Sequence, residues 1–255
     1  MLSKISFLLA LSASASVFAS SITMTTSDKP ARAGVSTSCG FRLVARTTDP
    51  FYEVAGDVEG TILEAYHDGA NHCVPILRKP DAKSPGNVFY FDKPPQNQSL
   101  SLLTDSVASI ANGAGPAISY GFSVQPSTES IVSTYPPEQG VSFQAGGANS
   151  STPVSLADYH IPTRGLFIVN EQAGGGTFIA CKRPIPYYSQ RKMITVEYIY
   201  SNVPTPDTGN TVPFGCAPIR LVPICANLPA VPPGSLATHD YVQPTICYTT
   251  INGTP

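Results

Sequence analysis

Short runs of β-branched and aromatic residues, separated by turn residues, make up most of this sequence. In residues 41–46, Phe-Arg-Leu-Val-Ala-Arg, the residues Phe41, Leu43 and Ala45 alternate with the rest. A period of two is typical of a strand that buries one face. Asp-Gly, Asn-Gly, Ser-Pro-Gly and Gly-Gly sequences lie between the runs and favour turns. The pattern therefore predicts many short strands.

Helical periodicity is nearly missing, and only residues 151–159 could form a short helix. A parallel sheet needs helices between its strands, so this architecture is excluded. Many short strands at regular spacing are typical of antiparallel folds. We therefore predict an all-β fold, an antiparallel β-sandwich or barrel.

The chain divides into four segments by composition. Lys4, the apolar run 5–11 and the small residues up to Ala19 are typical of a secretory signal peptide, so we expect cleavage after residue 19. Residues 20–38 are polar and patternless and indicate a flexible leader. Residues 39–228 hold the strand runs and predict a single all-β domain. Residues 229–255 are rich in proline and predict an extended tail.

The charge and the apolar pattern narrow the classes of partner. Charged residues are 13% of the chain and the formal net charge is -2, so no basic stripe for nucleic acid is present. No later stretch is apolar over the length that a membrane helix needs, so no membrane association is expected after signal cleavage. With 25 prolines and 20 glycines, the sequence fits a secreted, extracellular, loop-rich protein.

Six cysteines follow the predicted signal peptide, and an even number on the oxidising secretory route predicts disulfides. They are Cys39, Cys73, Cys181, Cys216, Cys225 and Cys247. If one strand joins Cys216 to Cys225, at about 3.3 Å per residue, their Cα atoms lie roughly 30 Å apart. A disulfide needs them within about 7 Å. Either Pro218 or Pro223 folds this segment into a turn, or the two cysteines have different partners, which we favour; Cys247 could pin the tail.

Three Asn-x-Ser/Thr sequons begin at Asn97, Asn149 and Asn252, each among polar turn residues. Such sites accept N-linked glycans on the secretory route, where the glycan must point into water. The sequons therefore fit the secretory route that the signal peptide and the cysteines predict.

The segment Tyr-His-Asp-Gly-Ala-Asn-His-Cys, residues 66–73, gathers several groups that could carry chemistry. As a zinc site it would use His67, His72 and Cys73, with Asp68 in support, but this spacing is uncommon and an oxidised cysteine cannot bind as a thiolate. The alternative is a tight turn at Asp68-Gly69 between two strands, with a positive φ at the glycine. We predict the turn, and neither a metal site nor a cofactor.

Enzymatic activity is the competing class of function. The chain has no Gly-x-Ser-x-Gly sequence, but a site could assemble in space near His67, His72 or His160, the last with Asp158 close by. Glycoside hydrolysis needs two carboxylates, for which Asp57 and Glu59 are the nearest pair, although they fit a solvated strand face better. The sequence therefore assigns no catalytic residue, and a secreted hydrolase stays as the alternative.

Tyrosines offer a possible binding surface instead. Tyr187 and Tyr188 lie in a proline-bent segment with several basic residues, and Tyr198 and Tyr200 share one face of a predicted strand. The first pair could contact a glycan or an acidic partner. The second pair could form a binding strip or a cross-strand aromatic ladder.

Several segments together resemble a family of secreted fungal proteins of unknown function. They are GTILEAYHDGANHCVPIL, NVFYFD, ISYGFSV, GLFIV, FIACK and PFGCAPIRLVPIC, within residues 41–228. Phe178 and Gly215 stand where that family has tryptophan and serine. The resemblance implies a β-rich secreted domain, no catalytic residue, and a disulfide between Cys181 and Cys216.

The leading interpretation is therefore a secreted, disulfide-bonded, N-glycosylated fungal protein without catalytic activity. We expect it to act in the extracellular space or at the cell wall, with a cell-wall polysaccharide or an extracellular protein as its partner.

Overall fold

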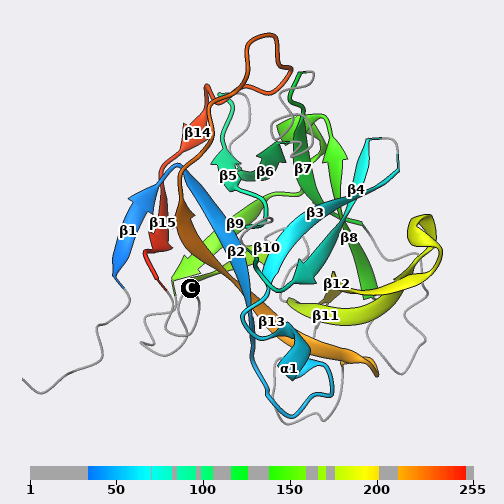
Figure 1. Cartoon of the computed structure of the whole chain (residues 1–255). Helices are drawn as coiled ribbons and strands as arrows, with labels where there is room; N and C mark the ends of the chain where they lie inside the picture. The colour runs from blue at the N-terminus through cyan, green and yellow to red at the C-terminus, as the bar shows by residue number, and fades with distance from the viewer. Residues whose placement is uncertain are drawn as a thin grey trace, which may run out of the picture. The chain divides into compact units, whose positions relative to one another are not determined.

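The computed structural model describes residues 34–69, 71–81, 85–95, 99–105, 116–125, 138–158, 166–170, 176–200 and 212–250 (Figure 1). Strands dominate this part of the chain, as the alternating pattern predicts. They are β1 (Val35–Ser38), β2 (Gly40–Thr47), β3 (Ile62–Gly69), β4 (His72–Arg78), β5 (Phe89–Asp92), β6 (Ser101–Asp105), β7 (Ser119–Val124), β8 (Glu138–Ala145), β9 (Val154–Asp158), β10 (Leu166–Asn170), β11 (Gly176–Ile185), β12 (Arg191–Tyr200), β13 (Cys216–Ala226), β14 (Val242–Gln243) and β15 (Thr245–Tyr248).

The helical elements in the described residues are short. They are α1 (Ala55–Val58), η1 (Gly147–Ser150) and η2 (Pro186–Tyr188). Within this part of the chain, no helix has the length and apolar character needed to cross a membrane. Residues 151–159, for which a helix was conceivable, instead contain strand β9, which pairs with β10 in a separate two-stranded sheet.

The large sheet is almost entirely antiparallel and closes on itself. Its strand order is β1-β15-β13-β11-β12-β4-β3-β2-β5-β6-β7-β8, with β14 added to β5. Additional pairings join β13 to β2, β12 to β8 and β4 to β8. The β13–β2 pairing closes one ring, β13-β11-β12-β4-β3-β2, and the β4–β8 pairing closes a second ring, β4-β3-β2-β5-β6-β7-β8. The two rings share β2, β3 and β4. The all-β, sandwich or barrel-like prediction is confirmed.

Strands also lie outside the predicted bounds of the domain. The supposed leader contains β1, whose four residues pair with β15 in the supposed tail, from Val35 opposite Tyr248 to Ser38 opposite Thr245 (Figure 1, left). Strand β14 of the same tail pairs with β5. Neither β1 nor the strands of the tail show a clear apolar period in the sequence. Backbone hydrogen bonds to a strand distant in sequence stabilise them as strands.

Aromatic side chains connect the core across strands that are distant in sequence. Ring centroids lie 5.6 Å apart for Phe89 and Phe143, 5.5 Å for Phe143 and Phe122, 6.0 Å for Phe122 and Phe178, and 5.1 Å for Phe178 and Tyr198. All five side chains are buried. They come from β5, β8, β7, β11 and β12, so one continuous aromatic column joins both rings of strand pairings.

Two disulfides are present, Cys181–Cys216 and Cys225–Cys247. The first is the pair that the family resemblance implies, and its cysteines lie directly opposite each other on β11 and β13, with a Cα–Cα distance of 4.1 Å. Cys216 and Cys225 have different partners, as the length of the intervening strand favours. Cys247 ties the tail to β13.

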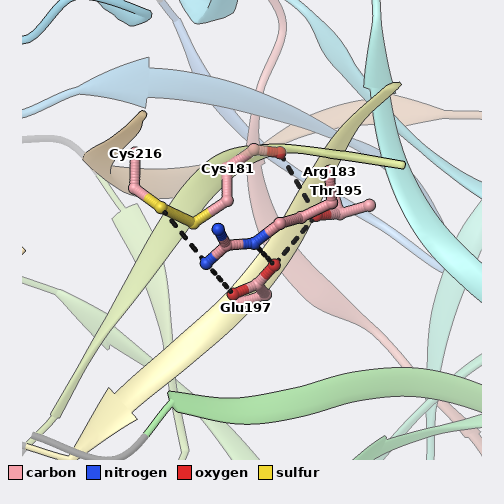
Figure 2. Close-up of a disulfide and its surroundings, with 5 residues drawn as sticks. All are labelled: Cys181, Arg183, Thr195, Glu197 and Cys216. Carbon is pink, nitrogen blue, oxygen red and sulfur yellow. Dashed lines mark hydrogen bonds and ion pairs between the residues drawn. A yellow bond between two sulfur atoms is a disulfide. The ribbon is translucent and has the colours of Figure 1, made fainter. Parts of the chain in front are cut away.

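An ion pair lies against the Cys181–Cys216 disulfide (Figure 2). Arg183 Nε donates to Glu197 Oε1 over 3.0 Å, and an Arg183 terminal nitrogen lies 3.7 Å from Cys216 Sγ. The Thr195 hydroxyl is within hydrogen-bonding distance of both the Cys181 carbonyl and Glu197. The disulfide is therefore shielded by polar side chains of β11 and β12 as well as by burial.

The prediction that all six cysteines form disulfides is wrong, because Cys39 and Cys73 are free thiols. Cys73 lies on β4 within the apolar core and is 6% exposed, whereas Cys39 is exposed in the bend between β1 and β2. Cys73 behaves as a small apolar core residue, which is common for a free cysteine. Burial, with a smaller contribution from the Asp68 carboxylate, raises the pKa of the Cys73 thiol to about 12.

Replacement of Phe143 by alanine should strongly destabilise the fold. The ring contacts both Phe89 and Phe122 and is 0% exposed, so its removal opens a cavity that costs about 3–5 kcal/mol of unfolding free energy. Phe51→Ala is the matched control, because Phe51 is 94% exposed and its loss should change stability by less than about 0.5 kcal/mol. Urea denaturation measures both values, and similar losses would contradict the described core.

The two free thiols should differ in reactivity. Iodoacetamide at alkaline pH should alkylate Cys39 in the native protein and Cys73 only after unfolding, because the thiolate is the reactive form. The raised pKa of Cys73 also implies a contribution to stability that is complete below about pH 9 and is lost as the pH rises through about 12. Mass spectrometry of unreduced peptides measures the labelling, and a Cys39–Cys73 linkage would refute this assignment.

Candidate functional site

Four aromatic side chains gather where the β3–β4 hairpin meets the turn η2. They are Tyr66, His67, Tyr187 and Tyr188, called the aromatic corner below. Ring centroids are 4.7 Å apart for Tyr66 and Tyr188, 5.0 Å for Tyr187 and Tyr188, and 5.8 Å for His67 and Tyr187. Tyr187 is 58% exposed, and His67 is exposed beside it. The corner therefore presents aromatic surface to solvent.

Local backbone geometry brings η2 to the hairpin. Pro186 occupies the start of η2, where a missing backbone N–H costs nothing. Ser189 and Gln190 follow with φ values of 53° and 65°, and this left-handed pair turns the chain back into β12. The Tyr188 hydroxyl donates to the His67 carbonyl and fixes η2 to β3. Partial burial, followed by the neighbouring Tyr66 and Tyr187 hydroxyls, raises the pKa of Tyr188, so the phenol stays neutral.

Polar groups flank the aromatic corner along the same hairpin. His72 Nδ1 lies 2.6 Å from Asp68 Oδ1, and Arg78 Nε lies 2.5 Å from Glu64 Oε2. The His72 side chain is 43% exposed, so this pair can exchange hydrogen bonds with a ligand. Exposed aromatic rings beside hydrogen-bonding groups can contact a ligand that has both an apolar face and polar groups.

The hairpin predicted in residues 66–73 exists, but its turn is displaced. Asp68 and Gly69 belong to β3, where the register shifts between His67 and Gly69, and the left-handed residue is Asn71, with a φ of 59°. The bulge at Asp68 explains the displacement, since one extra residue delays the turn. Among the described residues, no group of three or more His, Cys, Asp or Glu side chains is arranged to hold a metal ion.

The structure places the tyrosines of the predicted surface in different surroundings. Tyr187 and Tyr188 lie in the aromatic corner. Tyr198 is 1% exposed and packs on Phe178 directly across the β11–β12 pair, so it forms the cross-strand ladder and not a binding strip. The side chain of Tyr200 lies outside the described residues. Tyr66 and His67 contact the rings of Tyr188 and Tyr187. These residues are distant in sequence, so the strand pattern did not predict the contacts.

Within the described part of the chain, the residues considered for hydrolysis do not form a site together. His67 contacts Tyr187 and His72 contacts Asp68, while His160 lies outside the described residues. Of the candidate carboxylate pair, Glu59 is held by Arg46 and Thr47. Burial opposes ionisation, but those hydrogen bonds outweigh it and lower the pKa of Glu59. Glu59 therefore serves as an ion-pair partner between α1 and β2.

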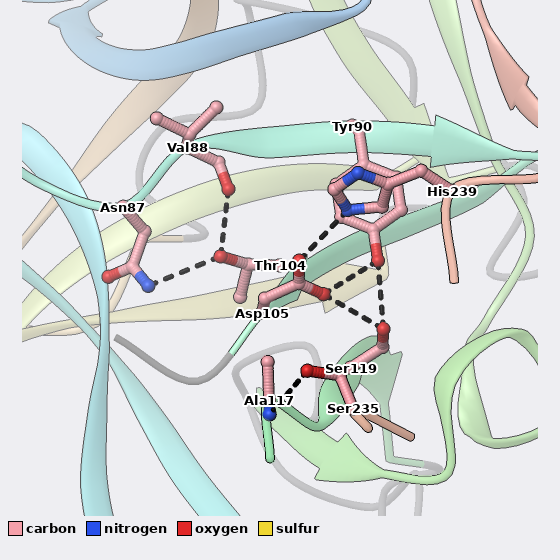
Figure 3. A network of polar contacts seen from close by, with 9 residues as sticks. All are labelled: Asn87, Val88, Tyr90, Thr104, Asp105, Ala117, Ser119, Ser235 and His239. Atoms are coloured by element: carbon pink, nitrogen blue, oxygen red, sulfur yellow. Dashed lines mark hydrogen bonds and ion pairs between the residues drawn. The ribbon is translucent and has the colours of Figure 1, made fainter. Parts of the chain in front are cut away.

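A buried polar network was not predicted from the sequence (Figure 3). Asp105 Oδ1 accepts hydrogen bonds from the Tyr90 and Ser119 hydroxyls, each over 2.8 Å, and Asp105 Oδ2 lies 2.9 Å from His239 Nε2. Tyr90, Asp105 and Ser119 are all buried. Burial and the Asp105 carboxylate raise the pKa of Tyr90. The network joins β5, β6 and β7 to the C-terminal segment.

The order of contacts in this network differs from that of a catalytic triad. In a triad the histidine lies between the acid and the serine and removes the serine proton. Here Asp105 lies between Ser119 and His239, and the serine also contacts Tyr90 over 2.9 Å. The geometry supports a structural role, and further contacts agree: Ser235 Oγ accepts from Ala117 N, and Leu236 N and Ala237 N donate to Ala117 O.

Comparison with known proteins gives a family match but no assigned activity. A family model described as "Domain of unknown function (DUF7907)" matches residues 38–225. The chain is 28% identical over 219 residues to a protein of Stachybotrys chartarum named "Antigenic protein SchS34", covering 84% of this chain and 87% of that protein. No solved structure matches.

Replacement of His239 by alanine should loosen the C-terminal segment. Asp105 Oδ2 would lose its partner while still buried, which costs about 1–3 kcal/mol. Hydrogen exchange should then speed up at Leu236, Ala237 and Val242. Tyr241→Ala is the control in the same segment, because that side chain is 45% exposed. Equal exchange in both variants would contradict the role of His239.

Proposed function

We propose a non-catalytic binding role in the extracellular space for this chain, which belongs to the family of the domain of unknown function DUF7907. The ligand we propose is a polysaccharide of a cell wall, contacted by the aromatic corner. The observation that carries the proposal is the exposed Tyr187 ring in the turn η2 between β11 and β12, held edge-on by His67 and Tyr188.

The composition of the aromatic corner supports a sugar ligand. A pyranose ring has an apolar C–H face that can pack on an aromatic ring, and hydroxyl groups that need hydrogen-bond partners. Tyr187 and His67 supply the aromatic surface, while Asp68 and His72 supply an acceptor and an exposed imidazole.

Several features support an extracellular location. The first nineteen residues have the composition of a signal peptide. Two disulfides fit an oxidising compartment. A relative over most of the chain is named as an antigenic protein of a fungus. Together they support a fungal protein that is released and meets extracellular surfaces.

Retention of the purified protein on insoluble chitin, glucan and mannan tests the proposal. Retention is expected on at least one of them, and Tyr187→Ala should weaken it about tenfold or more, equivalent to about 1.4 kcal/mol. Tyr241→Ala is the matched control, since it removes an exposed tyrosine near β14 and should leave retention unchanged.

The outcomes separate the alternatives. Absence of retention on all three polymers would reject a polysaccharide ligand and leave an extracellular protein as the partner to be sought. Retention that both tyrosine variants reduce equally would show binding elsewhere on the surface. Release of soluble sugars during the incubation would contradict the non-catalytic role.

A further inference from the structure

We propose that Asn149 carries an N-linked glycan. Asn149, Ser150 and Ser151 form a sequon without proline at its centre, and the hydroxyl that the modification requires belongs to Ser151. Asn149 lies on η1 and is exposed, so the folded protein can accommodate a large polar group there. The other two asparagines, Asn97 and Asn252, lie outside the described residues.

The turn η1 is held by its neighbours in a way that leaves Asn149 on its outer side. Ser150 Oγ lies 2.9 Å from the Gln144 carbonyl and 3.0 Å from the Gly147 carbonyl, and the Ser151 hydroxyl donates to the Ala148 carbonyl. On the inner side, a Cβ atom at Gly121 of β7 would approach Gly147 O to 2.4 Å. A glycan at Asn149 can therefore extend into solvent while these packed contacts remain.

The segment just before η1 also contacts the β3–β4 hairpin. Ala145 N, just before η1, donates to Asn71 O over 3.0 Å, and Gln144 pairs with His72. The glycan would therefore sit beside the β4 strand of the hairpin. Tyr188 is attached to His67 on β3, the other strand of the same hairpin. Glycosylation is compatible with the proposed binding role but does not depend on it.

The neighbouring serines provide a sharp test. The full chain, fused to the signal sequence of a yeast host, is secreted and digested, and its glycopeptides are identified by mass spectrometry before and after removal of N-glycans by an amidase. We expect occupancy at Asn149 in the wild type and in Ser150→Ala, because the central position tolerates alanine. Asn149→Gln and Ser151→Ala should each abolish it.

Because the host signal sequence directs secretion, the test does not depend on whether the natural chain is secreted. A secreted protein bare at Asn149 would overturn the proposal, whatever the occupancy of Asn97 and Asn252. Equal occupancy in Ser150→Ala and Ser151→Ala would also overturn it, since the sequon would then not direct the modification. Polysaccharide retention by Asn149→Gln is measured separately, and its loss or survival bears only on the binding role.

Discussion

Strand β13 closes one of the two rings of the sheet and links it to the C-terminal strands. Its first residues pair with β11, from Cys216 to Ile219, and its later residues pair with β2, from Ile219 to Ala226. It also meets β15 through Ile224 and carries one cysteine of each disulfide. Pro218 lies where the partner changes, and its carbonyl accepts from Thr48 N. Because proline cannot donate a backbone hydrogen bond, it suits a position where one pairing ends and another begins.

The sequence was sufficient to predict the elements whose information is local. Alternation in residues 41–46 predicted β2, where Phe41, Leu43 and Ala45 are buried as expected. Turn residues predicted the β3–β4 hairpin, although the bulge moved its left-handed residue to Asn71. Strand length correctly separated the partners of Cys216 and Cys225. These inferences succeed because side-chain period and backbone rise are properties of a short segment.

Features that depend on distant contacts could not be predicted in this way. Strand β1 is ordered by pairing with β15, and His239 meets Asp105 across 134 residues of sequence. Nothing in the residues around Asp105 distinguishes it from other acids at the end of a strand. The even number of cysteines wrongly predicted a disulfide for every cysteine, because pairing also depends on which strands lie side by side. Cys73 faces the core on β4, where its cross-strand neighbours are His67 and Phe143 and not a cysteine, so it has no disulfide partner opposite it.

The aromatic corner combines both kinds of information. Tyr187 and Tyr188 stood out in the sequence, but only the fold brings them to Tyr66 and His67. The β3–β4 hairpin, which carries part of this surface, is anchored on β3 by Tyr188 to the His67 carbonyl and in its turn by Ala145 N to the Asn71 carbonyl. Anchoring matters because a ligand that meets rigid side chains does not have to offset their loss of conformational entropy. For the proposed polysaccharide ligand, each repeat of the polymer would offer the aromatic corner the same contact again.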